Sequence, residues 1–177
     1  VQSVLDVNGN KIINIVDVLC EYLNCKLDDL SSKLVDYNFA IEVNNELYIR
    51  SVSKVDIENR SISFFCDISF GDILYLVKNK EFVSQTQIDY RNYSSMKKQE
   101  PIGAILNDCI LRRLFNSGNL NSLKTFNDIP LAGYSTFGEL LGLNINQTLT
   151  ALFFYKLEDN SEYYDDYVDN FVDKYSS

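Results

Sequence analysis

Histidine is absent from the 177 residues of this chain. Its absence removes the commonest general base, the Ser-His and Cys-His nucleophile pairs and the usual nitrogen ligand of zinc. The chain also lacks a glycine-rich loop of the P-loop or dinucleotide-binding type. Carboxylates, lysine or metal-bound water could still support catalysis. On balance the sequence predicts a protein that is not an enzyme and that needs no metal or other cofactor.

Long hydrophobic runs are missing as well. No stretch of about 20 apolar residues could span a bilayer, and the N-terminus lacks the basic and then apolar order of a signal peptide. The sequence therefore predicts a soluble chain. Because it begins at Val1 and not at Met, it is expected to be an excised fragment, and any membrane anchor would lie outside it.

Basic residues are scarce, with 16 Lys and Arg against 25 Asp and Glu, for a net charge of −9. The last 20 residues hold seven acids and one base, so this tail carries −6 and leaves −3 on residues 1–157. The body is therefore nearly balanced and has no basic cluster. This charge distribution predicts no nucleic-acid partner and no contact with an anionic membrane.

Cysteine is present but not in a metal-binding or disulfide pattern. The four cysteines form no C-x-x-C pair and are Cys20, Cys25, Cys66 and Cys109. Such spacing makes a zinc site or a disulfide framework unexpected. The cysteines are instead predicted to be reduced thiols of a cytoplasmic protein.

The first half of the chain combines two helical patterns with several β patterns. Apolar residues from Ile12 to Leu23 recur at the spacing of one helical face, and the paired acids that open residues 28–35 favour a second short helix. Period-two alternation predicts strands joined by polar turns. These strands cover residues 1–7, 39–43, 46–57, 62–68 and 73–77. The last four are expected to form an antiparallel meander.

The second half contains a mixture of both patterns. Helices are predicted over residues 81–100 and 109–116, and strands over residues 102–107, 129–134 and 148–157. The fold class is therefore predicted to be α+β, with a mostly antiparallel sheet covered by helices. No linker interrupts residues 1–157, which are expected to form one domain.

The acidic tail, residues 158–177, has a double stripe of aromatic and aliphatic residues at steps of four. This pattern predicts an amphipathic exit helix that leads to an output domain outside the fragment. Two alternatives remain for its apolar face. The helix could fold back on its own domain, or it could pair with a second copy of the chain and form a homodimer.

A seven-residue run, GYSTFGE at 133–139, precedes an Asn-x-Thr segment at 146–148. In this order the two segments resemble the FIST C-terminal domain. Weaker agreement comes from LDVNGN at 5–10, YIRSV at 48–52 and NDCILRR at 107–113. The sequence departs from the family at Ile145, where a histidine is common. The N-terminal FIST domain that accompanies this family is absent from the chain.

The resemblance implies a sensory domain of bacterial signal-transduction proteins, such as chemotaxis transducers and histidine kinases. It also implies a small-molecule ligand, such as an amino acid. We expect a carboxylate to bind the ammonium group of such a ligand, an arginine its carboxylate, and neutral side chains to add hydrogen bonds, while glycines let the backbone approach. The ligand-binding candidates are Arg112, Arg113, Gly133, Thr136, Gly138, Glu139, Asn146 and Thr148.

Other roles compete for these residues. The glycine-flanked turn could be structural with Glu139 in solvent, and one of the adjacent arginines is expected to be a surface residue. Arg50 is a further candidate cation, with a cross-strand ion pair as the alternative. For the whole chain, the competing functions are a protein-interaction or dimerisation module and a hydrolase that uses Cys109 as nucleophile.

Overall fold

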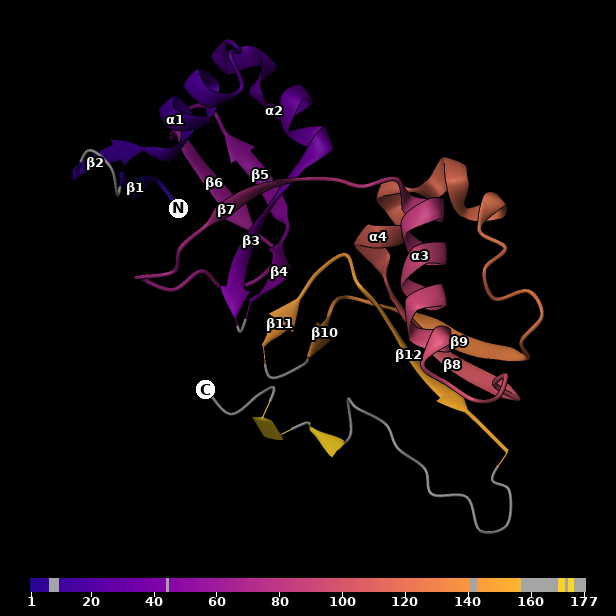
Figure 1. Cartoon of the computed structure of the whole chain (residues 1–177). Helices are drawn as coiled ribbons and strands as arrows, with labels where there is room; N and C mark the ends of the chain where they lie inside the picture. Colours follow the sequence, from indigo (N-terminus) through magenta and orange to yellow (C-terminus); the bar gives the residue numbers. More distant parts are fainter. Residues whose placement is uncertain (7–9, 44, 141–142, 157–168, 171, 174–177) are drawn as a thin grey trace. The chain divides into compact units, whose positions relative to one another are not determined.

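The computed structural model describes residues 1–6, 10–43, 45–140, 143–156, 169–170 and 172–173. It divides into two compact units, residues 1–79 and residues 80–177 (Figure 1). The mixture of helices with mostly antiparallel strand pairs confirms the α+β class. The predicted exit helix at 158–177 lies outside the described residues, apart from four positions. No helix in the described part of the chain is long and apolar enough to cross a membrane.

The first unit opens with an antiparallel pair, β1 (Ser3–Asp6) and β2 (Lys11–Asn14), followed by helix α1 (Ile15–Tyr22). The prediction that the helix begins at Ile12 is wrong, because Ile12 pairs with Leu5 in the β hairpin and is 79% exposed. The helix begins after Asn14, whose side-chain oxygen accepts a hydrogen bond from the Val16 N–H at 3.0 Å. This N-cap satisfies a backbone donor that the helix leaves free.

Three short turns of helix follow: η1 (Leu27–Asp29), α2 (Leu30–Lys33) and η2 (Leu34–Asp36). They confirm the short helix predicted over 28–35. Leu30 and Leu34, four residues apart, are both buried against the core. This spacing places the two side chains on one face.

Five strands complete the first unit: β3 (Tyr37–Val43), β4 (Glu46–Arg50), β5 (Val52–Asp56), β6 (Ser61–Phe64) and β7 (Tyr75–Lys78). The predicted meander is wrong. One sheet has the order β4-β3-β7, and β5 pairs with β6 in a separate hairpin. β3 is the central strand of this sheet. It pairs with β4 on one side and with β7, which comes much later in the chain, on the other.

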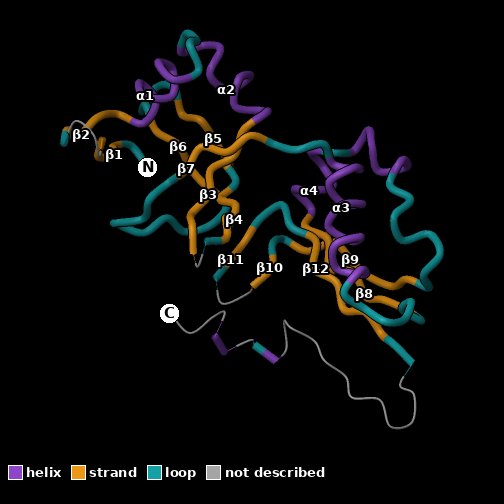
Figure 2. Tube along the Cα trace, in the orientation of Figure 1, coloured by secondary structure: helices purple, strands orange, loops and turns teal. Residues whose placement is uncertain are grey.

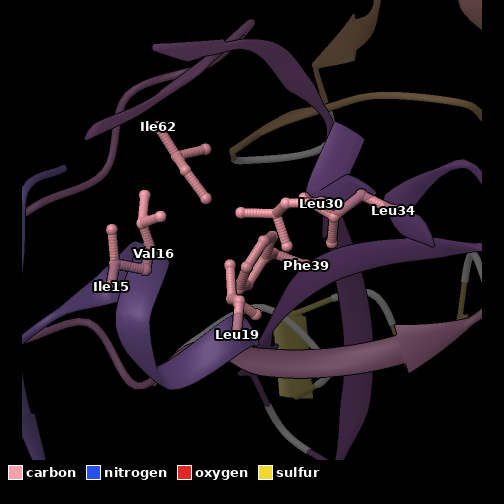
Figure 3. Packing of buried hydrophobic residues seen from close by; sticks show 7 residues of the cluster. All are labelled: Ile15, Val16, Leu19, Leu30, Leu34, Phe39 and Ile62. Carbon is pink, nitrogen blue, oxygen red and sulfur yellow. The ribbon is translucent and has the colours of Figure 1, made fainter. Parts of the chain in front are cut away.

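The core of the first unit gathers apolar side chains from α1, α2 and η2 and from strands β3 and β6 (Figure 3). Phe39 on β3 meets Phe64 on β6 edge to face, with ring centroids 5.3 Å apart. The buried members of the cluster are Ile15, Val16, Leu19, Leu30, Leu34, Phe39 and Ile62. This cluster holds the helices against the strands by removing apolar surface from water.

The second unit begins with helix α3 (Phe82–Ser95), capped by Glu81, and confirms a helix within residues 81–100. Its sheet has the order β12-β8-β9, formed by β12 (Leu149–Phe154), β8 (Gly103–Cys109) and β9 (Leu131–Thr136). β8 pairs with β12 antiparallel and with β9 parallel. Helices α4 (Ile110–Phe115) and η3 (Ser117–Ser122) follow β8 and provide the crossover to β9.

Helix α3 packs on this sheet through aromatic rings. Tyr90 lies 5.2 Å from Phe126 and 5.5 Å from Phe153 between ring centroids, and Tyr93 stacks on Phe153 at 4.9 Å. A short hairpin, β10 (Glu139–Leu140) and β11 (Asn144–Ile145), connects β9 to β12 (Figure 2). The aromatic contacts hold α3 against the sheet, and the hairpin lies between β9 and β12 along the chain.

Candidate functional site

The candidate site lies where three strands of the second unit share an edge. β8 and β9 are parallel, so their carboxyl ends meet, and Cys109 is the register partner of Thr136. β12 is antiparallel to β8, so its beginning lies at the same edge. The Cys109 N–H donates to the Thr148 carbonyl oxygen at 3.0 Å. This topology brings polar residues from distant segments together.

Glu139 is the centre of the cluster. Its side chain is only 8% exposed. One carboxyl oxygen accepts a hydrogen bond from the Thr136 hydroxyl and the other from the Thr148 hydroxyl. Both oxygens are therefore partnered, as a buried carboxyl group requires. Glu139 is not the solvated turn residue of the competing interpretation.

Arg112 and Asp108 form an ion pair beside this cluster. Nη1 of Arg112 lies 3.0 Å from Oδ1 of Asp108, and the two side chains are 11% and 16% exposed. Nη2 donates to the Thr86 hydroxyl at 2.7 Å. The guanidinium also covers the ring of Phe82, 4.5 Å from its centroid. Arg112 thus joins α4 to β8 and α3.

The pKa of Glu139 is raised above its ordinary value of 4.5, chiefly because burial disfavours the carboxylate. The negative charge of Asp108 raises it further. The hydrogen bond from Thr136 and the positive charge of Arg112 act in the opposite direction but do not compensate for burial. Asp108 and Arg112 are therefore close enough to Glu139 to influence its charge.

Glu139 is expected to make the protein less stable as the pH rises. Because its pKa is higher in the folded chain than in the unfolded chain, the stability present below the unfolded value of about 4.5 is lost as the pH rises through the folded value. Glu139→Gln removes the titrating group. The unfolding free energy of the wild-type protein minus that of E139Q, from urea denaturation at about pH 4 to 8, should therefore fall with rising pH.

Glu81 offers a control of opposite sign. Its side chain caps α3, and hydrogen bonds from the Ser84 and Val83 N–H groups lower its pKa. The contribution of Glu81 is therefore present above its unfolded pKa and lost as the pH falls. The difference between wild type and Glu81→Gln should rise with pH. A pH-independent difference for E139Q would contradict the raised pKa of Glu139.

Asn146 lies beside Glu139 and is fully buried, with an exposed fraction of 0%. Its side-chain Oδ1 and Nδ2 have no hydrogen-bond partner among the described residues. An unpaired buried polar group destabilises the folded state by about 1–3 kcal/mol. An amide with both its oxygen and its nitrogen unpaired is therefore strongly destabilising unless another molecule binds it. Among the eight ligand-binding candidates, all of them described residues, Asn146 alone has buried polar side-chain atoms without a described partner.

Gly138 shapes the backbone around this amide. Its φ of +137° is a conformation that other residues rarely adopt. A Cβ atom here would lie 2.8 Å from the Ile145 carbonyl oxygen and 3.1 Å from Nδ2 of Asn146. Glycine therefore allows the turn after β9 to approach the end of β11. Gly133 is different, since it lies in the middle of β9 opposite Leu106, away from Glu139 in the register.

Arg113, the neighbour of Arg112, is exposed and makes no described hydrogen bond or ion pair. Adjacent helical positions face different directions, so only one of the two arginines can point at the sheet edge. The structure brings Arg112, Thr136, Glu139 and Thr148 together with Asn146 nearby. It does not place Arg113 among them.

Sequence reasoning missed Asp108, Thr86 and Phe82. Asp108 could have been found, because it precedes Arg112 by four residues, the spacing of opposite charges that pair along a helix, although Asp108 itself lies on β8 just before α4. Thr86 and Phe82 belong to α3 and meet Arg112 only in the tertiary structure. No pattern in the chain links them to it.

Two other candidates remain, Arg50 in the first unit and Cys109 at the same strand ends as the cluster. Arg50, at the end of β4, is buried beside Cys66, where burial raises the pKa of the thiol and the guanidinium opposes that shift. Its cross-strand ion pair stays a prediction. Cys109 is 0% exposed at the end of β8, which does not favour its role as a nucleophile. Across the described residues, no group of three or more Cys, Asp or Glu could hold a metal ion.

Comparison with known proteins identifies one family. A family model described as the FIST C domain matches residues 16–141, which is more than half of the chain. No curated protein and no solved structure matches this chain. The matched range includes Arg112, Thr136 and Glu139. It begins after the LDVNGN segment and ends before Asn146 and Thr148, which belong to the stretch beyond the match.

Proposed function

Because the chain belongs to the FIST C domain family, which is associated with sensory functions in signal transduction, we propose that it binds a small polar ligand at the Glu139 cluster. The cluster consists of Arg112, Thr136, Glu139, Asn146 and Thr148. Its role is recognition and not catalysis. The observation that carries the proposal is the buried, unpartnered amide of Asn146.

The amide supports ligand binding through its energetic cost. A carboxamide offers two donors and an acceptor, and here the described residues use none of them. Glu139, next to it in the hairpin end, already has both oxygens partnered by threonine hydroxyls. A ligand with both donor and acceptor groups would satisfy the amide and recover the free energy that its burial costs.

The charges of the cluster favour a zwitterion, such as an amino acid. Glu139 can hold an ammonium group, since its carboxyl oxygens can each accept more than one hydrogen bond. Arg112 uses one N–H toward Asp108 and one toward Thr86, and a guanidinium has five. Its other N–H groups are available for a carboxylate. With a carboxylate on one side and a guanidinium on the other, the site would bind the two charged ends of a zwitterion in one orientation.

The wider context is part of the same proposal. The domain would act in the cytoplasm of a bacterial cell, as the sensing part of a chemotaxis transducer or histidine kinase. Its partners would be an N-terminal FIST domain, an output domain and a second copy of the chain. The absence of a basic cluster supports a function without nucleic-acid or membrane contact.

A thermal-shift screen of the protein against amino acids and other small zwitterions tests this proposal. A ligand at about 100 times its Kd stabilises the folded state by about 2.7 kcal/mol, which raises the Tm by roughly 5–10 °C for a chain of this size. The same ligand should give no shift with Glu139→Gln. It should retain its effect on Arg113→Ala, which changes an exposed arginine outside the cluster.

Two results would oppose the proposal. One is a screen in which no zwitterion raises the Tm of the wild-type protein. The other is a ligand whose shift is unchanged in E139Q but lost in R113A, because that pattern would place its site elsewhere on α4. The matched variants thus separate binding at the cluster from binding at the surface.

The second candidate function is a protein-interaction module, and exposed apolar side chains near the site favour it. Phe137 is 93% exposed, and Tyr134 and Leu140 are also exposed. Apolar groups gathered on a surface often mark a protein contact. Phe137→Ser should lower self-association in light scattering if this surface pairs two copies. A monomeric wild-type protein would argue against that pairing.

A further inference from the structure

The end of helix α1 brings two cysteines of the first unit together. The helix ends at Tyr22 with Leu23 as its C-cap, and the residue after the cap, Asn24, has a left-handed φ of +47°. The Asn24 N–H donates to the Glu21 carbonyl oxygen at 3.2 Å, and the Cys25 N–H donates to the Cys20 carbonyl oxygen at 3.0 Å. This pair of hydrogen bonds is the Schellman motif.

The motif determines which side chains meet. In a Schellman motif, the second residue after the C-cap contacts the residue three positions before the C-cap. Here these residues are Cys25 and Cys20, and burial, followed by the neighbouring Cys25 thiol, raises the pKa of the Cys20 thiol. Both side chains pack against the buried core cluster of the unit, and both remain partly exposed. The two sulfur atoms are therefore neighbours within reach of a small reagent.

From this geometry we infer that Cys20 and Cys25 are a modification site, at which small disulfides oxidise the two thiols to an intramolecular disulfide. The site is independent of the Glu139 cluster and of the ligand proposed for it. Disulfides that form in a reducing compartment are typically transient and serve redox sensing. The inferred bond is accordingly reversible.

The reaction proceeds by thiol–disulfide exchange. Cys25 attacks first, because burial raises the pKa of the Cys20 thiol, as do the nearby Cys25 thiol and Asp17, while Arg60 opposes them. The Cys25 sulfur loses its proton, bonds to one sulfur of the reagent, RSSR, and releases RS⁻, which takes up a proton. The Cys20 sulfur then attacks Cys25, loses its proton and displaces the second RS⁻. Two protein thiols are oxidised, and one RSSR is reduced to two RSH.

The remaining cysteines have no such arrangement in the described part of the chain. Cys109 is fully buried at the end of β8. Cys66 is half-buried next to Arg50, and its pKa is raised by burial. Neither has a second thiol as neighbour among the described contacts, so Cys66 can serve as the matched control for a partly exposed thiol.

The test uses oxidised glutathione on the folded protein, followed by alkylation of free thiols and digestion with trypsin. Cleavage after Lys11 and Lys26 leaves both cysteines in one peptide, residues 12–26. In the wild-type protein and in Cys66→Ser, we expect most of this peptide to lack two hydrogen atoms and to carry no alkyl group. Dithiothreitol should restore both alkylation sites.

The variants identify the mechanism. In Cys20→Ser the resolving thiol is missing, so a glutathione adduct should persist on Cys25. Urea denaturation of C20S and C25S establishes that each remains folded. The inference fails if the folded wild-type peptide is recovered with two alkyl groups or with stable glutathione adducts, or if oxidation instead crosslinks two chains.

Discussion

Gly133→Ala is expected to lower the unfolding free energy of the protein by about 3 kcal/mol, the upper range for an added group that forces the backbone to shift. A Cβ atom at Gly133 would overlap the Leu106 carbonyl oxygen and lie 3.0 Å from the Leu106 carbonyl carbon. Both are backbone atoms of the central strand β8, so no side-chain rotation can relieve the overlap. The pairing of β8 with β9 would have to shift.

Gly118→Ala is the matched control for this substitution. Gly118 has open space around the position of a Cβ atom, and its φ is not in the left-handed region. Its replacement should change the unfolding free energy by less than about 0.5 kcal/mol. Urea denaturation followed by circular dichroism measures both variants. Equal stability of G133A and G118A would show that β9 can move away from β8 at little cost.

Arg112→Ala is expected to lower the unfolding free energy by about 3 kcal/mol, because it leaves the half-buried Asp108 carboxylate without its partner. The change also removes the hydrogen bond to Thr86 and the contact with the Phe82 ring. Since Arg112 lowers the pKa of Glu139, its loss should raise that pKa further. The loss of unfolding free energy that accompanies ionisation of Glu139 should then continue to higher pH in R112A than in the wild-type protein.

Arg113→Ala separates these effects from a change in net charge. It removes the same charge one residue later, from an exposed side chain without described contacts. Its effect on the unfolding free energy should stay within about 0.5 kcal/mol. If R112A and R113A proved equally stable, the ion pair between Arg112 and Asp108 would make no net contribution to the unfolding free energy.

Local patterns were sufficient to predict most elements of this chain but not their boundaries. The strand around residues 39–43 follows from a period of 2, and the strand at 102–107 from a short apolar run. The helix over 81–100 was predicted from a polar segment that has no strand pattern and ends before Pro101. The beginning of α1 was misplaced because Ile12 fits the helical face equally well as it fits a strand. Asn14, an N-cap residue type, was the signal that would have corrected it.

The candidate site could be predicted only where its contacts join residues close together in the sequence. Thr136 and Glu139 are three residues apart around Gly138, so their contact is local and the turn signature includes both. The unpartnered state of Asn146 could not be read from the sequence, because it depends on what surrounds the amide. The cysteine pair was missed because Cys20 and Cys25 do not have C-x-x-C spacing, although a left-handed Asn24 brings them together.

By itself, the sequence determined the α+β class, the absence of histidine chemistry and the glycine-flanked turn that carries Glu139. Only the tertiary structure decided that β7 returns to β3, that β8 and β9 are parallel, and that Thr86 meets Arg112. The reason is physical. Periodicity and capping depend on residues a few positions apart, whereas strand partners compete across the whole chain, and packing selects among pairings that local patterns leave equal.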